Sequence, residues 1–344
     1  MNGILSPHSI AGNIALGLGA LALLVIAADL AVSRLIGLAE YLRVSSTFMG
    51  MTVVSLATSI PEITAHVTAA VNILRGTLNY EVGSAIVLGA NIGSDVVQQT
   101  LIMGVIVFVA GRLYFRRYFL WKSMVPMIAT TLMCIALGWD GVLSRFDGII
   151  LLGSFVLYNY FLYWDERKYF RPVPQEATPG SADGPAVQNS RQALGAALVT
   201  VGAIAVTVAS AQIVLQSTEF VVLATGVGGS LIGVVTLGTA SALPELVTSL
   251  SGVRRNHHGI SLGTLVGSNI TNPLVAFGLG AVISTFWMPR PVLAWDLPWE
   301  AVTGAVLWAI LWFTKGRLNR LGGVYLVTLY VIYLVSRVVF FAAD

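Results

Sequence analysis

The sequence GMTVVSLATSIPE at residues 50–62 returns in a closely similar form, GVVTLGTASALPE, at residues 233–245. A constant offset of 183 residues aligns the two copies, and the Pro-Glu pair that ends the first copy falls on the Pro-Glu pair that ends the second. Two copies of one motif in the two halves of a chain indicate an internal duplication. The predictions of fold and function start from the two acids of these pairs, Glu62 and Glu245.

A second motif follows each copy and supports the duplication. It reads GANIGSD at residues 89–95 and GTLVGSN at residues 263–269, and an offset of 174 residues places Asp95 on Asn269. The smaller offset means that the first copy has nine more residues between its two motifs than the second. Two paired motifs in the same order indicate that both halves of the chain descend from one unit.

The composition predicts that these motifs lie in a membrane. The chain has 344 residues, of which 56% are hydrophobic and 10% are charged, whereas soluble domains carry roughly 25% charged residues. The mean hydropathy is +0.82, and several apolar runs exceed the roughly 18 residues that span a bilayer. These values exclude a soluble enzyme, a disordered chain and a nucleic-acid-binding protein. The single cysteine, Cys134, permits no intrachain disulfide bond.

Apolar runs predict ten membrane spans. They cover residues 10–32, 46–73, 82–110, 119–138, 146–164, 194–222, 229–253, 259–286, 297–314 and 322–342. Residues 165–191 are polar and rich in proline and glycine, as is typical of a linker, and they separate two halves at residues 1–164 and 192–344. Because each half has an odd number of spans, the repeat is inverted. The predicted fold is an all-α integral membrane protein with ten transmembrane helices in two inverted five-helix repeats, an architecture of secondary transporters.

The distribution of basic residues predicts the orientation. When the segments between spans are assigned alternately to two sides, one side receives fifteen of the 19 basic residues, and the other receives Arg75, Arg145, Arg290 and Arg337. Loops rich in Lys and Arg remain in the cytoplasm. We therefore expect a plasma (inner) membrane protein with a cytoplasmic linker and both termini outside.

The paired acids indicate a cation site. A charge at the centre of a membrane costs at least roughly 2.5–3.5 kcal/mol, which is tolerated where the group faces an ion, a partner or water. The proline before each acid frees the backbone carbonyl four residues earlier, that of Ala57 or Ala240. The loosened turn lets the neighbouring carbonyls of Thr58 and Ser241 point inward beside the two acids. A site made only of oxygen atoms is typical of calcium and sodium. The alternative is a protonated Glu that is hydrogen-bonded between helices, and it must be invoked twice.

Asp95 is expected to supply a third carboxylate to this site, with Asn269 at the equivalent position of the second half. Asn91 lies one helical turn before Asp95 and is expected on the same face. The glycines and serines of the second motif also permit close helix packing, which is an alternative reason for their presence.

The two motif pairs resemble those of the cation/calcium antiporter superfamily, and of the sodium/calcium exchanger family in particular, whose alpha repeats look like G-T-S-x-P-E followed by G-S-N. The resemblance implies exchange of sodium for calcium by alternating access, without a cofactor. It implies that Glu62 and Glu245 hold calcium with the backbone carbonyls of Thr58 and Ser241. It also implies that Ser59 helps to bind sodium, whereas Ala242 lacks the corresponding hydroxyl.

Two residues near the paired acids favour other functions of the same fold. The absent hydroxyl at Ala242 and the presence of His66 four residues after Glu62 favour, as an alternative, a proton/cation exchanger or an exchanger of another divalent cation on the same fold. The alternative, structural interpretation of His66 is a polar group that is hydrogen-bonded at a helix interface. A channel or an ion-sensing scaffold is less consistent with interrupted helices in inverted repeats, and we expect no enzyme because no Ser-His or metal-hydrolase arrangement is present.

Overall fold

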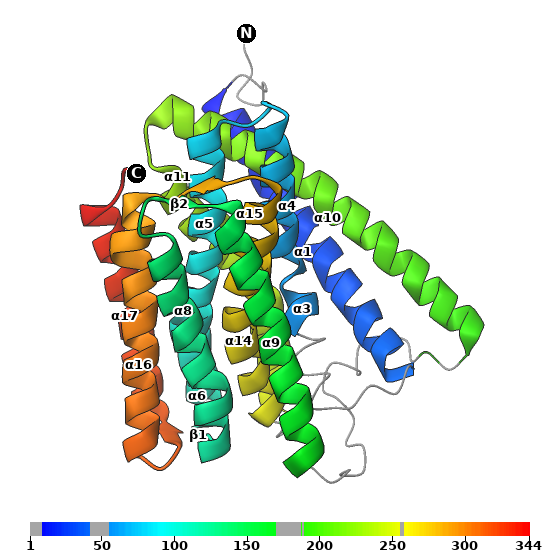
Figure 1. Cartoon of the computed structure of the whole chain (residues 1–344), viewed down its shortest axis with the longest axis vertical. Helices are drawn as coiled ribbons and strands as arrows, with labels where there is room; N and C mark the ends of the chain where they lie inside the picture. The colour runs from blue at the N-terminus through cyan, green and yellow to red at the C-terminus, as the bar shows by residue number, and fades with distance from the viewer. Residues whose placement is uncertain (1–8, 42–54, 170–186, 188, 255–257) are drawn as a thin grey trace.

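The computed structural model describes residues 9–41, 55–169, 187, 189–254 and 258–344, and these residues are almost entirely helical (Figure 1). Within them, eight helices are long and apolar enough to cross a membrane: Ile10–Ala31, Tyr80–Ala110, Arg117–Leu137, Arg145–Trp164, Ser190–Thr225, Gly229–Val247, Leu262–Ile283 and Arg320–Phe340. Two of the ten expected spans are not among them. Part of the span expected at 46–73 lies outside the described residues, and the helix in the span expected at 297–314 has 17 residues.

The helices of the two halves follow the expected spans in order. Those of the first half are α1 (Ile10–Tyr41), α3 (Ser55–Thr58), α4 (Ile60–Leu74), α5 (Tyr80–Val96), α6 (Met103–Ala110), α7 (Arg117–Phe119), α8 (Val125–Leu137) and α9 (Arg145–Tyr169). Those of the second are α10 (Ser190–Thr225), α11 (Gly229–Gly233), α12 (Thr239–Ser241), α13 (Leu243–Arg254), α14 (His258–Thr271), α15 (Gly278–Ile283), α16 (Leu297–Phe313) and α17 (Arg320–Phe340). Helix α9 extends five residues into the stretch expected as a linker, most of which lies outside the described residues.

Within the part of the chain that the structure describes, five π-helical segments interrupt the long helices. They are η2 (Val97–Ile102), η3 (Leu120–Met124), η4 (Val234–Gly238), η5 (Asn272–Phe277) and η6 (Val292–Asp296). The second motif of each half ends within a few residues of η2 or η5, so both halves change helical pitch at equivalent places. Segments of this kind are frequent at functional sites because they redirect side chains.

Both Pro-Glu motifs lie at helix breaks, as the prolines predict. In the first half α3 ends at Thr58, Ser59 forms a turn with φ −79° and ψ 3°, and α4 begins with Pro61 in its first turn. In the second half α12 ends before Ala242, which has φ −78° and ψ −6°, and α13 follows. The two breaks have the same backbone geometry, and each places an acid in the first turn of a new helix.

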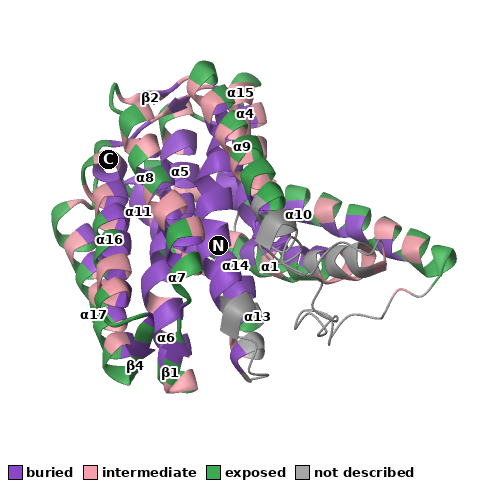
Figure 2. Cartoon of the chain, turned by 60° about the horizontal axis from the view of Figure 1, so that its bottom comes forward, coloured by how far each residue is buried: buried purple, intermediate pink, exposed green. Residues whose placement is uncertain are grey.

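Helices α5 and α14 form the centre of the molecule (Figure 2). In the most apolar stretches of the spans that contain α5 and α14, 78% and 83% of the residues are buried, whereas 17% are buried in the corresponding stretch of α9. Glycines let α5 approach the interrupted helix of the second half closely. A Cβ atom on Gly89 would lie 2.2 Å from the Ser230 carbonyl oxygen, and one on Gly233 would lie 2.2 Å from the Ile86 carbonyl oxygen.

This close crossing makes Gly233 intolerant of a side chain. We expect Gly233→Ala to lower the free energy of unfolding by about 1–3 kcal/mol, the usual cost of overpacking, because the new methyl group would overlap the α5 backbone. The matched control is Gly202→Ala in α10, where a Cβ atom meets nothing within 4 Å. Chemical denaturation of the detergent-solubilised protein measures both variants, and a Gly233→Ala protein as stable as the control would contradict this packing.

Two short strand pairs among the described residues join the halves, a feature that the all-α prediction missed. Strand β1 (Arg112–Tyr114) pairs antiparallel with β4 (Arg317–Asn319), and β2 (Val142–Leu143) pairs antiparallel with β3 (Phe286–Trp287). Each pair joins one strand from each half, and Figure 1 shows β1 and β2 at opposite ends of the molecule. The strands follow helix ends, where free backbone groups need hydrogen-bond partners.

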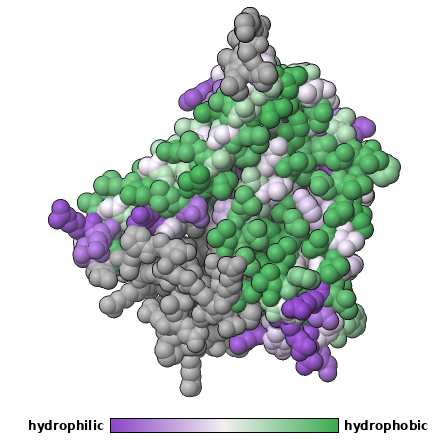
Figure 3. Space-filling model, turned by 180° about the vertical axis from the view of Figure 1, so that it is seen from behind, coloured by the Kyte–Doolittle hydropathy of each residue, from purple (hydrophilic) through white to green (hydrophobic). Residues whose placement is uncertain are grey.

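Helices α1 and α10 pack against each other along one side and slant away from the other helices at their lower ends (Figures 1 and 2). The beginning of α1 and the C-terminus lie at the same end of the molecule. Hydrophobic side chains cover most of the described surface seen from behind (Figure 3). The β1–β4 end carries exposed basic residues: Arg112, Arg116, Arg117, Lys315, Arg317 and Arg320. The surface is therefore that of a membrane protein with a charged end.

Candidate cation site

Glu62 lies buried in the first turn of α4, with 2% of its surface exposed. Its Oε1 atom accepts a hydrogen bond of 2.9 Å from the Ser94 hydroxyl of α5. That hydroxyl accepts a bond of 3.1 Å from Nε2 of Gln98 in η2. The carboxylate of the first motif is thus oriented by the serine of the second motif in the same half.

Glu245 has an equivalent position in the second half and is fully buried. Its Oε1 atom accepts a hydrogen bond of 3.4 Å from the Ser268 hydroxyl of α14. Ser94 and Ser268 occupy equivalent places in the GSD and GSN motifs. The same serine position therefore contacts the same acid position in both halves.

The Pro-Glu motif of each half places a hydroxyl group beside the acid of the other half. The Ser241 hydroxyl lies beside the Glu62 carboxylate, and the Thr58 hydroxyl lies beside the Glu245 carboxylate. Thr58 and Ser268 also lie within hydrogen-bonding distance of each other, with 3.2 Å between their oxygens. The two carboxylates are close enough for their charges to interact, so the two Pro-Glu motifs belong to one site.

Ser59 and Ser241 bond to their own helices through their hydroxyls. Ser59 donates to the Ser55 carbonyl at 2.9 Å, and Ser241 donates to the Gly238 carbonyl at 3.2 Å. Both residues are fully buried. In each case the structure directs the hydroxyl to a backbone carbonyl, and a hydroxyl oxygen is also a suitable ligand for a hard cation.

Asp95 is fully buried and lies among amide side chains. Its Oδ1 atom accepts a bond of 2.7 Å from Nδ2 of Asn272, and its carbonyl accepts one of 3.1 Å from Nδ2 of Asn269. The Asn91 amide donates to the Asn272 carbonyl at 3.4 Å. The Asp95 carboxylate interacts electrostatically with those of Glu62 and Glu245. The structure thus brings all eight predicted residues into one buried region.

Many oxygens of this region lack a hydrogen-bond donor. Seven buried side-chain oxygens have no partner among the residues that the structure describes: Glu62 Oε2, Asn91 Oδ1, Asp95 Oδ2, Gln98 Oε1, Glu245 Oε2, Asn269 Oδ1 and Asn272 Oδ1. Buried polar atoms are ordinarily hydrogen-bonded. All seven are acceptors drawn from both halves, which is the environment that a desolvated cation requires.

Carboxylates alone do not form this site. Within the described residues, no group of three or more Asp, Glu, His or Cys side chains is arranged to hold a metal ion. Any cation here is therefore held by a mixture of carboxylate, amide, hydroxyl and carbonyl oxygens. Such a mixture suits hard cations and does not suit soft metals.

His66 does not face the Glu62 carboxylate. Its Nδ1 atom lies 2.9 Å from the Glu62 backbone carbonyl oxygen. Its ring packs near Phe277 and Phe286, with centroids 5.4 and 5.8 Å away. The structure therefore favours the interpretation of His66 as a hydrogen-bonded group at a helix interface.

Two polar positions of this region received no specific role from the sequence. Gln98 and Asn272 hold Ser94 and Asp95, respectively, and they are equivalent positions at the offset of 174 residues. The equivalence of these two polar positions in the repeat is the sequence signal by which they could have been predicted. Glu300 was missed entirely, because it lies outside both repeated motifs. It is buried in α16 and is close enough to Asp95 for their charges to interact.

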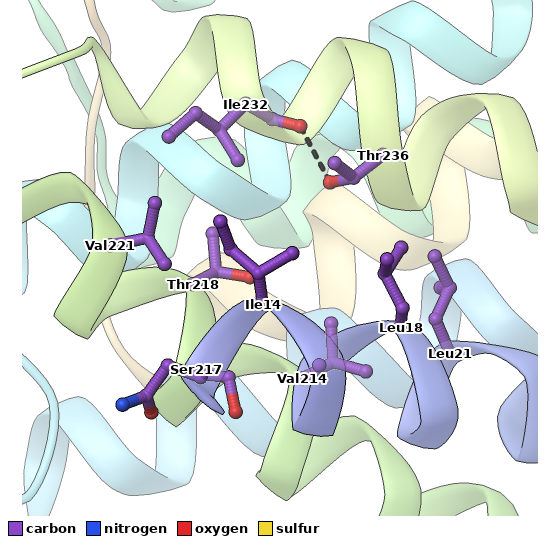
Figure 4. Close-up of a pocket in the computed structure, with 11 residues that line it drawn as sticks. Ile14, Leu18, Leu21, Val214, Ser217, Thr218, Val221, Ile232 and Thr236 are labelled. Carbon is purple, nitrogen blue, oxygen red and sulfur yellow. Dashed lines mark hydrogen bonds between the residues drawn. The ribbon is translucent and has the colours of Figure 1, made fainter. Parts of the chain in front are cut away.

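A cavity of about 250 Å³ separates the α1–α10 pair from the interrupted helix of the second half (Figure 4). Its walls come from four elements, with Leu18 on α1, Val214 and Thr218 on α10, Ile232 on α11 and Thr236 on η4. Most lining side chains are apolar. The pair is thus incompletely packed against the element that leads to Ser241 and Glu245.

Comparison with known proteins identifies the family. The profile of the family described as "Sodium/calcium exchanger protein" matches residues 12–164 and 195–339, which is most of the chain. The chain belongs to the sodium/calcium exchanger family. The resemblance seen in the repeated motifs is confirmed, and the family is one of membrane ion exchangers rather than enzymes.

Relatives of the exchanger are membrane proteins and antiporters. A protein from Alkalimonas amylolytica named as antiporter CaxA is 29% identical over 77% of this chain and 78% of its own length. The inner membrane protein YrbG of Escherichia coli strain K12 is 26% identical over 69% of each chain. The sodium/calcium exchanger MaX1 of Methanosarcina acetivorans is 24% identical over 87% of this chain and 90% of its own length.

Two kinds of solved exchanger share the fold. A structure of the sodium-calcium exchanger NCX_Mj matches with a TM-score of 0.62 and 22% identity, and it covers 93% of this chain and 98% of its own. A structure of the H+/Ca2+ exchanger CAX matches with a TM-score of 0.75 and 15% identity over 94% of this chain and 82% of its own. At identities of 22% and 15%, these two matches show only that this chain shares their fold.

Proposed function

We propose that the chain is a secondary active antiporter that exchanges sodium for calcium across the membrane by alternating access. The observation that carries this proposal is the group of seven buried acceptor oxygens that find no donor among the described residues, which come from both halves and include one oxygen of each of three carboxylates. Three negative charges and several neutral oxygens match the requirements of a calcium ion or of sodium ions in its place. Calcium and sodium compete for the same oxygens, and this competition is the basis of exchange.

Each residue of the site has a proposed role. Glu62 and Glu245 hold calcium from opposite sides, together with the backbone carbonyls of Thr58 and Ser241. Asp95 contributes a third carboxylate to the same region, and its charge interacts with those of the other two. The remaining predicted ligands are neutral oxygens that complete the shell: Ser59, Asn91 and Asn269. The identical backbone breaks before the two acids support this assignment, because they place both carboxylates at the start of a helix in equivalent surroundings.

Movement of α1 and α10 is the proposed means of switching access. These two helices pack mainly on each other and slant away from the other helices. The cavity between them and η4 means that little packing opposes a displacement there. A sliding pair beside a fixed site opens the site to one side of the membrane at a time.

The proposed arrangement is two inverted five-helix repeats in the plasma (inner) membrane, with residues 1–164 and 192–344 as the repeats. The strand pairs support it, because β1–β4 and β2–β3 have equivalent positions in the repeat yet lie at opposite ends. The cluster of exposed arginines beside β1 and β4 supports a cytoplasmic assignment for that end. The linker at 165–191 is then cytoplasmic and both termini are outside.

A second candidate is a proton/cation exchanger on the same fold. Ala242 favours it, because its side chain provides no hydroxyl where Ser59 provides one in the first half. A sodium position that loses an oxygen ligand binds sodium less tightly, which would shift the coupling toward protons.

Transport in proteoliposomes distinguishes the two candidates. We expect vesicles loaded with sodium and diluted into sodium-free buffer to accumulate calcium-45, whereas vesicles loaded with potassium do not. A proton gradient of equal size, imposed without sodium, should drive little uptake. Uptake that follows the proton gradient and ignores sodium would support the second candidate, and absence of uptake under every gradient would contradict both.

A further inference from the structure

Six exposed basic side chains form a cluster at the β1–β4 end of the molecule. This basic cluster consists of Arg112, Arg116, Arg117, Lys315, Arg317 and Arg320. The two segments that supply it, residues 96–139 and 301–343, contain no Asp or Glu. None of the six side chains forms an ion pair with a residue that the structure describes. Uncompensated positive charges that are held together favour an anionic partner.

The β1–β4 strand pair holds two of these side chains on one face. The middle residue of each strand, Leu113 or Leu318, is buried, and the residues on either side of it are exposed. Because side chains alternate across a strand, Arg112 and Arg317 share the outward face. Arg112 lies opposite Asn319, so Arg317 is its diagonal neighbour, and the Cβ atoms of such neighbours are roughly 7–8 Å apart. Two guanidinium groups at this spacing can donate to one phosphate group from two sides.

Aromatic rings orient two further arginines of the basic cluster. The Cζ atom of Arg117 lies 4.8 Å from the centroid of the Trp312 ring, and that of Arg320 lies 5.8 Å from the centroid of the Phe108 ring. A Cβ atom on Gly111, the residue before β1, would lie 3.7 Å from Nη2 of Arg320, so this side chain lies beside the start of the strand. An aromatic ring attracts the face of a guanidinium and leaves the N–H groups at its edge available to an anion.

Large apolar side chains adjoin the basic cluster and are also exposed. Phe313 is 83% exposed and Leu321 is 77% exposed, and Tyr114 lies between the basic residues on β1. In Figure 3 hydrophilic residues gather below a hydrophobic surface at the lower end of the molecule, where Figure 1 places β1. Aromatic and basic residues together are typical of the boundary between the hydrocarbon and headgroup regions of a membrane. A partner at this boundary has an anionic group and apolar chains in one molecule.

We propose that the basic cluster is a binding site for the headgroup of an anionic phospholipid. Arg112 and Arg317 donate to the phosphate oxygens from the outward face of the strand pair, and Arg320 donates from beside them. The acyl chains of the lipid lie against the neighbouring apolar side chains, Phe313 and Leu321. This inference requires only the membrane fold and is independent of which ions are transported.

Native mass spectrometry of the detergent-solubilised full chain measures the binding. The protein is titrated with phosphatidylglycerol and, for comparison, with the zwitterionic phosphatidylcholine. We expect phosphatidylglycerol to bind more tightly. In the double variant Arg112→Gln with Arg317→Gln, its affinity should fall about 25-fold, since each basic residue near an anionic lipid contributes roughly fivefold. The affinity for phosphatidylcholine should not change. Because the purified protein is already folded, an effect of the arginines on membrane orientation cannot account for such a loss.

The matched control is the double variant Arg145→Gln with Arg290→Gln. It removes the same charge from two exposed positions near the β2–β3 pair, where Asp140 and Asp147 lie in the same stretch of chain as Arg145. The control should bind phosphatidylglycerol like the wild type. Equal weakening in both double variants would show that net charge alone governs the affinity, and equal binding of the two lipids by the wild type would likewise overturn the proposal.

Inorganic phosphate tests whether the occupant is a lipid. It carries the charge of the headgroup without acyl chains, so it should not displace phosphatidylglycerol when both are present at the same concentration. Displacement would overturn the assignment of the site to a lipid.

A single variant, Arg320→Gln, covers the case in which the first double variant does not fold. It leaves the strand pair unchanged and should weaken phosphatidylglycerol binding about fivefold. Unchanged binding would contradict the proposal.

Discussion

Replacement of Glu62 or Glu245 by glutamine is expected to abolish calcium transport. Each change exchanges a negative oxygen ligand for a neutral amide of the same shape in a fully enclosed site. Because even the outer-shell partners of metal ligands are worth 10–100-fold in affinity, we expect the loss of a direct ligand to exceed roughly 100-fold. Calcium-45 uptake driven by a sodium gradient in proteoliposomes measures the loss.

The matched control is Glu81→Gln, the same chemical change at an exposed position of α5. It should transport calcium like the wild type. Because the two halves are equivalent, Glu62→Gln and Glu245→Gln should reduce calcium transport to a similar degree. If both variants transported calcium at the wild-type rate, the cation would have to lie elsewhere.

Replacement of Arg337 by methionine is expected to have the largest effect on stability. Arg337 is fully buried, and its Nε atom lies 3.0 Å from Oδ1 of Asp296, which also accepts a bond from Tyr333. The guanidinium also donates to the Ser230 hydroxyl, which in turn donates to the Asp344 carboxylate. Removal of one partner leaves a buried charge unpaired, so we expect a loss of about 3–5 kcal/mol in the free energy of unfolding.

Two comparisons test the cause of that loss. Arg290→Met changes an exposed arginine and should alter stability by less than about 0.5 kcal/mol. The double variant Asp296→Leu with Arg337→Met removes both charges and should be more stable than Arg337→Met alone. Unfolding of the solubilised proteins by denaturant measures all three, and a double variant less stable than the single one would show that the unpaired charge is not the cause.

The sequence predicted the parts of the site that repeat. Glu62 and Glu245 were identified because a Pro-Glu pair occurs twice, and the structure places both after equivalent helix breaks. The helical membrane fold was predictable from apolar runs alone, since each run must satisfy its own backbone inside a bilayer. Asp95 followed from its equivalence with Asn269.

Features that depend on contacts between distant residues were not predictable. Glu300 occurs once, and its relation to Thr131 and Asp95 depends on how α16 packs against α8 and α5. Arg337 was counted with the basic residues of the outer side, near the end of the span expected at 322–342, yet it is buried within α17 against Asp296. The strand pairs were missed because two or three residues are too few to form a hydropathy pattern.

Those strand pairs have a consequence for the order of assembly. Arg112 pairs with Asn319 and Val142 pairs with Trp287, so each pair joins residues far apart in the chain. A contact of this kind forms only after the intervening chain has been made, and closing so long a loop costs conformational entropy. Strands β1 and β2 therefore remain unpaired until the second half of the chain supplies β4 and β3. Each pair then joins one half to the other, at opposite ends of the molecule.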